Sequence, residues 1–283
     1  MTIVADYQLD VAGLLLGAGT SYELPDGVEG LGLPEVRTSD VPRPQDDGLF
    51  YGSDFLGKRT LTFRATILGD DPDDAGVKMD ALAAVWQPPE GSSANVPLTL
   101  EIPGQVSRVL FGRPRRLAFD LDNLKSGIVV ATLQYDVADP RWYDAVQSVL
   151  STAAATSGGG RTYNRTYNMT YAAGGTGGNL TAINAGNRRT RPVLTITGPS
   201  NTPRVENVTA GRYLLFNLTL GVGDFLVVDL DARTVLLGGT ASRYSSLSSG
   251  SSWWDLAPGV NLLKFTSADS LGTLQVAYRS AWL

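Results

Sequence analysis

Residues 57–68, GKRTLTFRATIL, are the stretch of sequence that decides the fold of the first half of the chain. Apolar and polar side chains alternate along it, which predicts a β-strand with one buried and one exposed face. The side chains expected on the buried face are Leu61, Phe63, Ala65 and Ile67. This strand supports the prediction that the N-terminal half is built mainly from strands.

A single helix is expected directly after this strand, over residues 72–86. Asp71 has the side chain and the position of an N-cap, and Pro72 suits the first helical position, where no amide hydrogen bond is lost. An apolar stripe follows at helical spacing, formed by Met79, Leu82, Ala83 and Trp86. Two consecutive prolines at 88 and 89 end the pattern.

Strands are predicted for the rest of the chain, on both sides of a junction rich in Gly, Ala, Ser and Thr at residues 151–160. In the first half they lie at 96–102, 106–111, 115–122 and 127–137. Seven or more short strands follow between residues 191 and 281 without a helical pattern, which is typical of a β-sandwich. We therefore expect a mainly β protein of two domains, residues 1–144 and residues 145–283.

The composition excludes most catalytic chemistry. The 283 residues contain no Cys and no His, which removes thiol and imidazole catalysis and the thiolate and imidazole metal sites. We therefore expect no catalytic, cofactor-binding or metal-binding residues and no enzymatic activity. A glycosidase, which needs only paired carboxylates, is the weakest of the alternatives that stay open.

One glycine-containing segment deserves comparison with a phosphate-binding loop. Residues 52–58, GSDFLGK, match the G-x-x-x-x-G-K pattern, but Arg59 stands where Ser or Thr would bind Mg²⁺. The segment is also followed by a predicted strand, whereas a phosphate loop opens a helix. We therefore reject a nucleotide site and interpret Gly52 and Gly57 as turn residues.

The net charge of −5 conceals two halves of opposite sign. Residues 1–144 carry 22 acidic and 12 basic side chains, a net charge of −10, and residues 145–283 carry 6 acidic and 11 basic ones, a net charge of +5. Electric fields of opposite sign favour the interpretation that the two domains face different partners. The equal alternative is that the charge difference reflects drift in surface composition. The densest basic cluster lies in the acidic half and consists of Arg108, Arg113, Arg115 and Arg116. Because the surrounding net charge opposes nucleic-acid binding, we interpret this cluster as a subunit interface.

A four-residue repeat at residues 161–171 gives a second candidate interface. If this segment is extended, one face carries aromatic, guanidinium and Met side chains, among them Tyr163, Arg165, Tyr167 and Tyr171. Such side chains are enriched in protein interfaces. We hypothesise that residues 158–178 form a Gly-flanked arm that docks on another chain. An edge hairpin packed on its own sandwich is the equal alternative.

Taken together, markers along most of the chain resemble the distal tail proteins (Dit) of long-tailed, non-contractile bacteriophages, especially those of actinobacterial phages. The markers are Val41-Pro-Arg-Pro44 with Gly48 and Gly52, the strand around Arg59, the Pro72–Trp86 helix, Asp139-Pro-Arg-Trp-Tyr143, Asn184-Ala-Gly-Asn187 before Pro192 and Thr197-Gly198, Trp254-Asp-Leu-Ala-Pro-Gly-Val-Asn261, and Tyr278-Arg-Ser-Ala-Trp282.

The resemblance implies an N-terminal β-sandwich or split-barrel domain with one helix, which forms a ring of six copies, and a peripheral galectin-like β-sandwich. It further implies a structural adaptor of the virion tail tip that joins the tail tube protein to the tail-tip hub, in an assembly with the tape measure protein. Genomic DNA would pass through the ring without specific binding. A tail-tip module that binds a carbohydrate or receptor during host attachment is the alternative. Because neither a signal peptide nor a membrane span is evident, we expect synthesis in the bacterial cytoplasm without membrane insertion.

Overall fold

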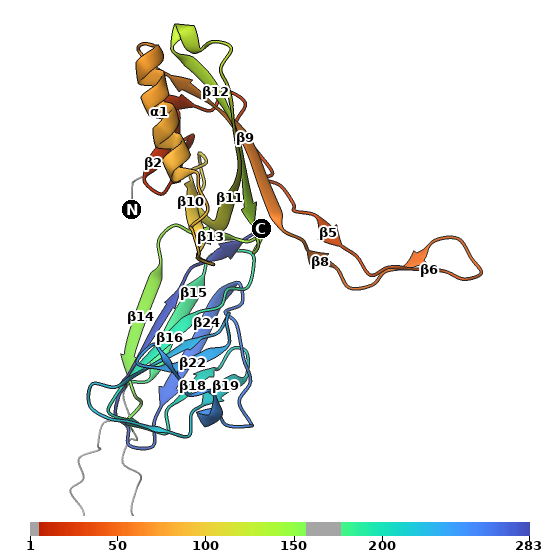
Figure 1. The fold of residues 1–283 in the computed structure, drawn as a ribbon. Helices are drawn as coiled ribbons and strands as arrows, with labels where there is room; N and C mark the ends of the chain where they lie inside the picture. Colours follow the sequence, from red (N-terminus) through yellow and green to blue (C-terminus); the bar gives the residue numbers. More distant parts are fainter. Residues whose placement is uncertain (1–5, 157–176) are drawn as a thin grey trace, which may run out of the picture. The chain divides into compact units, whose positions relative to one another are not determined.

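The computed structural model describes residues 6–156 and 177–283, and the chain divides into two compact units (Figure 1). The first unit comprises the chain up to Ala145 together with Leu283, and the second comprises Val146–Trp282. In the described part of the chain, no helix is long and apolar enough to cross a membrane.

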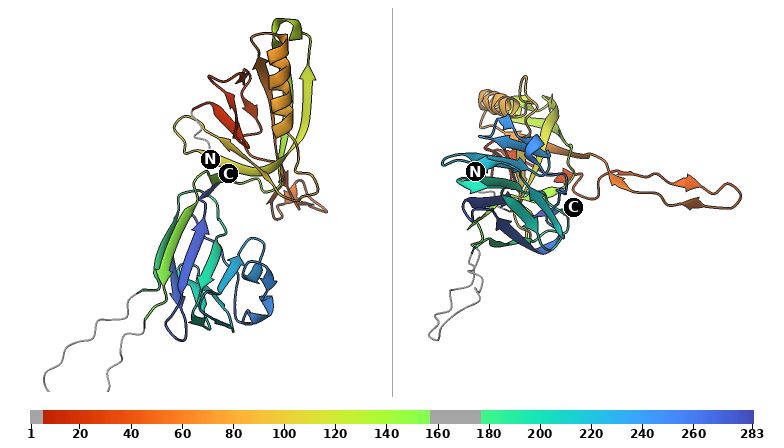
Figure 2. Two further views of the ribbon diagram at one scale, coloured as in Figure 1. Left: turned by 60° about the vertical axis from the view of Figure 1, so that its left-hand side comes forward. Right: turned by 90° about the horizontal axis from the view of Figure 1, so that it is seen from below.

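The first unit is a curled antiparallel sheet. Its strands are β1 (Gln8–Val11), β2 (Leu14–Gly17), β3 (Tyr22–Glu23), β4 (Val28–Glu29), β9 (Arg59–Leu68), β10 (Val96–Leu100), β11 (Arg108–Asp120), β12 (Ile128–Val137) and β13 (Trp142–Asp144). The order across the sheet is β2–β1–β10–β11–β12–β9–β3, with β4 beside β9 and β13 beside β11. Because β2 and β3 lie at opposite ends of this order yet follow each other in the chain, the sheet curls into a near-closed barrel (Figure 2).

The alternation along β9 is confirmed. Leu61, Phe63, Ala65 and Ile67 are all buried, and β9 pairs with β12 over its whole length, from Arg59 opposite Val137 to Leu68 opposite Ile128. A strand that contributes every second side chain to the interior and is paired from end to end forms the centre of this core.

The predicted helix is α1 (Pro72–Val85), which packs over β9 and β12 (Figure 1). The Asp71 carboxylate caps it, because Asp71 Oδ1 accepts a hydrogen bond of 2.8 Å from the amide of Asp74. Trp86 ends the helix and lies between the rings of Phe63 and Tyr135, with centroid distances of 5.5 and 6.0 Å. Its indole Nε1 donates to the carbonyl oxygen of Arg116 at 2.8 Å, which fixes the end of the helix to β11.

The strands predicted at 106–111 and 115–122 are one continuous strand, β11. The prediction of a break was wrong because the strand passes through an irregularity rather than a turn. The register of β11 against β12 shifts between Pro114 and Arg116. Proline has no amide to donate to the ladder, and a β-bulge accommodates it without ending the strand.

The second unit consists of strands only, apart from a short 3-10 turn, η2 (Tyr244–Ser246), within the residues that are described. The strands are β14 (Ser148–Ala153), β15 (Asn179–Asn184), β16 (Val193–Thr197), β17 (Ser200–Asn201), β18 (Arg204–Asn207), β19 (Arg212–Leu215), β20 (Thr219–Leu220), β21 (Phe225–Asp229), β22 (Thr234–Leu237), β23 (Ala241–Ser242), β24 (Gly259–Thr266), β25 (Thr273–Tyr278) and β26 (Ala281–Trp282). One sheet has the order β14–β25–β16–β21–β22–β23 and a second has the order β15–β24–β18–β19, with a small β17–β20 pair.

Side chains of both sheets meet in one buried core, which makes this unit the β-sandwich expected from the sequence. Ile196 and Val276 come from the first sheet, and Val205 and Phe265 come from the second. Buried amides fix the loops around this core. Asn184, 1% exposed, donates to the carbonyl oxygens of residues 188 and 256 and accepts from the amides of residues 186 and 281. The mainly β architecture with one α-helix is thereby confirmed.

Candidate assembly surfaces

The predicted arginine cluster lies on β11, and the bulge decides which of its members reach the surface. Arg115 and Arg116 are consecutive and both exposed, although neighbours in a regular strand point to opposite faces. Arg113, half-buried, lies just before the bulge. The bulge therefore gathers cationic side chains in one place, and we call Arg113, Arg115 and Arg116 the arginine ridge.

One carboxylate faces this ridge and is already neutralised by other groups. Asp136 accepts hydrogen bonds from Lys58 Nζ at 2.8 Å and Thr60 Oγ1 at 3.0 Å, and its Oδ2 lies 3.8 Å from Arg115 Nε. Burial by itself raises the pKa of Asp136, but the hydrogen bonds from Lys58, Thr60 and Gln134 outweigh it and lower the pKa. The ridge and Lys58 therefore keep a positive excess within a half of the chain whose net charge is negative.

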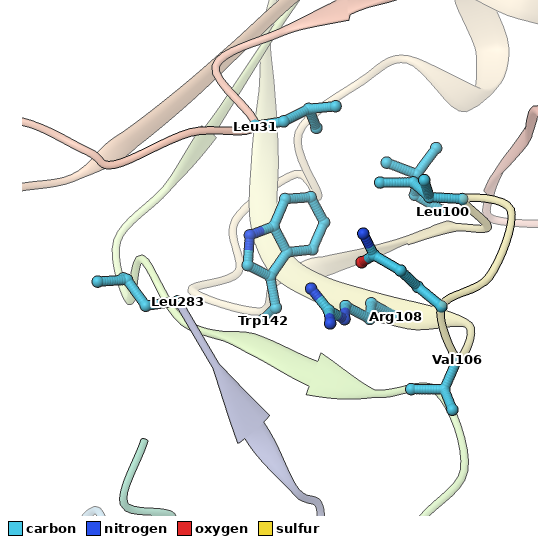
Figure 3. A pocket seen from close by; sticks show the side chains of 8 residues that line it. Leu31, Leu100, Val106, Arg108, Trp142 and Leu283 are labelled. Atoms are coloured by element: carbon cyan, nitrogen blue, oxygen red, sulfur yellow. The ribbon is translucent and has the colours of Figure 1, made fainter. Parts of the chain in front are cut away.

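Arg108 lies apart from the ridge. It stands seven residues before Arg115 on the same strand, which corresponds to about 23 Å. Its half-buried guanidinium lines a cavity of about 150 Å³ together with Leu100 and Trp142, and burial lowers its pKa (Figure 3). The structure thus brings together three of the four predicted arginines. The other predicted interface residues, Tyr163, Arg165, Tyr167 and Tyr171, lie outside the described residues.

A feature that the sequence analysis missed is a long hairpin that leaves the barrel between β4 and β9, at residues 36–56 (Figures 1 and 2). We call it the arm. It contains two short paired ladders, β5 (Val36–Arg37) with β8 (Phe55–Leu56) and β6 (Val41–Pro42) with β7 (Leu49–Phe50). The views agree that it reaches away from the barrel of its own unit.

Side-chain and backbone hydrogen bonds join the two sides of the arm between its ladders. Ser39 Oγ donates to the carbonyl oxygen of Ser53 at 3.1 Å and accepts from the amide of Ser53 at 3.0 Å, and Asp40 accepts from the amide of Gly52 at 2.8 Å. A Cβ at Gly52 would lie 2.3 Å from the carbonyl oxygen of Ser39, so only glycine permits this close approach. Gly52 is therefore part of a hairpin rather than of a phosphate-binding loop. It is not the turn residue that the sequence predicted, because its missing side chain allows the two sides of the arm to approach each other closely.

The arm exposes large apolar side chains to solvent. Every residue from 41 to 55 is exposed, including Val41 at 59%, Phe50 at 57%, Tyr51 at 90% and Phe55 at 59%. Large apolar side chains gathered on one exposed element mark an interaction surface.

The root of the arm is fixed by a buried arginine. Arg59, 1% exposed, donates to the carbonyl oxygens of Gly30 and Gly32 at 2.7 and 2.5 Å and to that of Pro140 at 3.0 Å. Its guanidinium carbon lies 5.1 Å from the centroid of the Trp142 ring, and burial lowers its pKa. The chain entering the arm is thereby bound to the strand that follows it.

The described residues contain no group of three or more acidic side chains placed to hold a metal ion. Two neighbouring tryptophans of the second unit, Trp253 and Trp254, belong to its core or pack against it. Trp254 is 3% exposed, and Trp253 stacks on Tyr244 with a centroid distance of 6.3 Å. The exposed arm and the arginine ridge are therefore the described surfaces that best suit contact between proteins.

Comparison with known proteins points the same way. Residues 185–282 match the protein family described as "Siphovirus-type tail component, C-terminal domain". The crystal structure of the Dit protein of phage SPP1 superposes on 98% of this chain and 99% of its own, with a TM-score of 0.66 and 16% sequence identity. The chain has the fold of a phage distal tail protein.

A second solved structure, the phage P2 baseplate in its activated conformation with Ca, contains a chain that matches 95% of this one and 97% of its own length. Its TM-score is 0.56 and its identity 11%. Among curated proteins no match is found. The distal tail protein fold thus spans both units of the chain, whereas the family match is confined to residues 185–282 of the second unit.

Proposed function

We propose that this chain is a structural, non-enzymatic component of the phage tail tip, a distal tail protein of the virion. The observation that carries the proposal is the match of the whole chain to SPP1 Dit, which extends over 98% of one chain and 99% of the other. The siphovirus tail-component match at residues 185–282 supports it independently, because it rests on sequence.

In this proposal six copies form a ring at the distal end of the tail tube, with the first unit of each copy in the ring. The resemblance to distal tail proteins gives as partners the tail tube protein, the tail-tip hub and the tape measure protein. It favours an actinobacterial phage as the source of the chain. A net charge of −10 on residues 1–144 suits a channel wall, because acidic side chains let DNA phosphates pass without binding.

Antibody labelling of purified virions tests the proposed function. Gold-labelled antibodies raised against the second unit, the part assigned to the periphery, should mark the end of the tail opposite the head. Antibodies against the major capsid protein serve as the control and should mark the head. Labelling spread along the tail tube, or confined to the head, would contradict the assignment.

A further inference from the structure

We propose that the arm of one copy docks on the arginine ridge of the next copy in the ring. The inference rests on the proposed function, since it takes the ring as given and names the two surfaces that join its neighbours. The partner is a second copy of this chain.

The first observation is the exposure of the arm. A hairpin of two strands has marginal stability by itself in water, and this one reaches away from its own barrel (Figure 2). Its side chains Phe50 and Tyr51 are exposed. Burial of these side chains against a neighbour would both stabilise the hairpin and remove apolar surface from water.

The second observation is charge complementarity. The arm carries four aspartates and two arginines, a net charge of −2. Among the described residues of the chain, no ion pair involves Asp47 or Asp54 of the arm, and none involves Arg113 or Arg116 of the ridge. Acidic and basic side chains that lack partners within one chain can neutralise each other between copies, and such pairing fixes register and excludes wrong partners.

The third observation concerns symmetry. The arm and the ridge are different surfaces, so a contact between them is heterologous, with the arm of each copy on the ridge of the next. Heterologous contacts propagate around a closed ring or along an open filament. A ring of identical copies therefore requires two complementary surfaces on each copy. If the arm instead contacted another tail protein, the charge complementarity between the arm and the arginine ridge would have no explanation.

Charge reversal tests the docking on the full-length chain. The ridge variant is Arg115→Glu with Arg116→Glu, and the arm variant is Asp47→Arg with Asp54→Arg. A control, Arg64→Glu with Lys125→Glu, makes the same change in net charge as the ridge variant at exposed positions of the same unit. Self-association is measured by sedimentation equilibrium at low and high salt, and circular dichroism confirms that each variant is folded.

The wild type should self-associate at low salt, and each of the two interface variants alone should raise the dissociation constant at least about tenfold. A chain carrying both the ridge and the arm reversals should associate again, whereas the control should match the wild type. A monomeric wild type, a ridge variant that behaves as the control does, or a combined variant without recovery overturns the proposal. Gold labelling at the tail tip would then still support the proposed function, because it does not depend on which surfaces meet.

Discussion

At the residue scale, single polar side chains fix the backbone where the first unit departs from a simple barrel. Arg59 occupies a position on the buried face of β9. Its guanidinium donates hydrogen bonds to three backbone carbonyl oxygens rather than to a carboxylate. Hydrogen bonds to a charged group contribute about 1.5–3 kcal/mol each to stability, whereas a buried acceptor that is left without a donor lowers stability. A buried charge is therefore tolerated here because it satisfies backbone groups that would otherwise have no donor.

Arg59→Met should lower the free energy of unfolding by about 3 kcal/mol, because the carbonyl oxygens of Gly30, Gly32 and Pro140 lose a charged donor. Urea denaturation of the full-length chain measures this change. Arg64→Met is the matched control on the opposite face of β9, where the side chain is 65% exposed, and should change stability by less than about 0.5 kcal/mol. Equal stabilities of the two variants would show that Arg59 does not hold the root of the arm.

Asp139 is a second polar side chain held by several hydrogen bonds, and it makes the stability of the first unit depend on pH. Asp139 accepts hydrogen bonds from Arg141 Nε at 2.8 Å and Nη2 at 2.7 Å, and from the Tyr143 hydroxyl at 2.6 Å. Burial by itself raises the pKa of Asp139, but these hydrogen bonds lower it below its usual value. A carboxyl with a lowered folded-state pKa stabilises the fold above its unfolded pKa, about 3.9, and the contribution is lost as pH falls through the folded value.

Tyr143→Phe should therefore reduce the pH dependence of stability on the acid side. The folded-state pKa of Asp139 moves towards its unfolded value, so the free energy of unfolding falls less steeply as pH drops below about 4. Urea midpoints measured at several acidic pH values give the slope. Tyr51→Phe removes the same hydroxyl at a site that is 90% exposed and should keep the wild-type slope. A wild-type slope in Tyr143→Phe would exclude this hydroxyl as the cause.

At the scale of elements, the arm is a hairpin whose integrity depends on close approach of its two sides rather than on a core. Its strands contact each other through short ladders and through Ser39, Asp40 and Gly52. An element that lacks a core of its own can be distorted without unfolding the barrel, so its stability is expected to be low and local.

Gly52→Ala should open the arm while leaving the barrel intact, because the new Cβ would lie 2.3 Å from the carbonyl oxygen of Ser39. Chymotrypsin should then cleave at Phe50, Tyr51 and Phe55 several times faster than in the wild type, with global stability changed by less than about 0.5 kcal/mol. Gly32→Ala is the control, because a Cβ there meets no atom within 4 Å. Unchanged cleavage of Gly52→Ala would contradict the close approach.

The contrast between these elements explains how much could be predicted from the sequence. β9 and α1 were predicted correctly because alternation, the Asp71 cap and Pro72 are local signals. The arm was missed because its ladders are only two residues long and contain Pro42, and because the bonds between Ser39 and Ser53 join residues 14 positions apart. The hydrogen bond from Arg59 to the carbonyl oxygen of Pro140 joins residues 81 positions apart, which no local pattern reveals.

The same limit applies to the candidate interface. The arginine cluster was visible as composition, but the exposure of both Arg115 and Arg116 follows from the bulge after Pro114. The bulge depends on pairing with β12 and is not a property of β11 alone. The docking of the Gly-flanked segment at residues 158–178 on another chain stays a prediction, since most of this segment lies outside the described residues.

At the scale of the whole molecule, the fold is retained at very low sequence identity. The likeness to SPP1 Dit spans nearly the whole of both chains at 16% identity, so most side chains differ while the architecture is the same. Charge complementarity such as that proposed between the arm and the arginine ridge limits which subunits can enter one ring.

The proposal of a tail-tip ring is tested most directly by a cryo-electron microscopy reconstruction of the tail tip in the intact virion. We predict six copies of this chain in one ring at the distal end of the tail tube, with the N-terminal units around the channel and each arm on the β11 strand of the neighbouring copy. A tail tip that lacks this chain, or that contains it in a number other than six, would contradict the proposal.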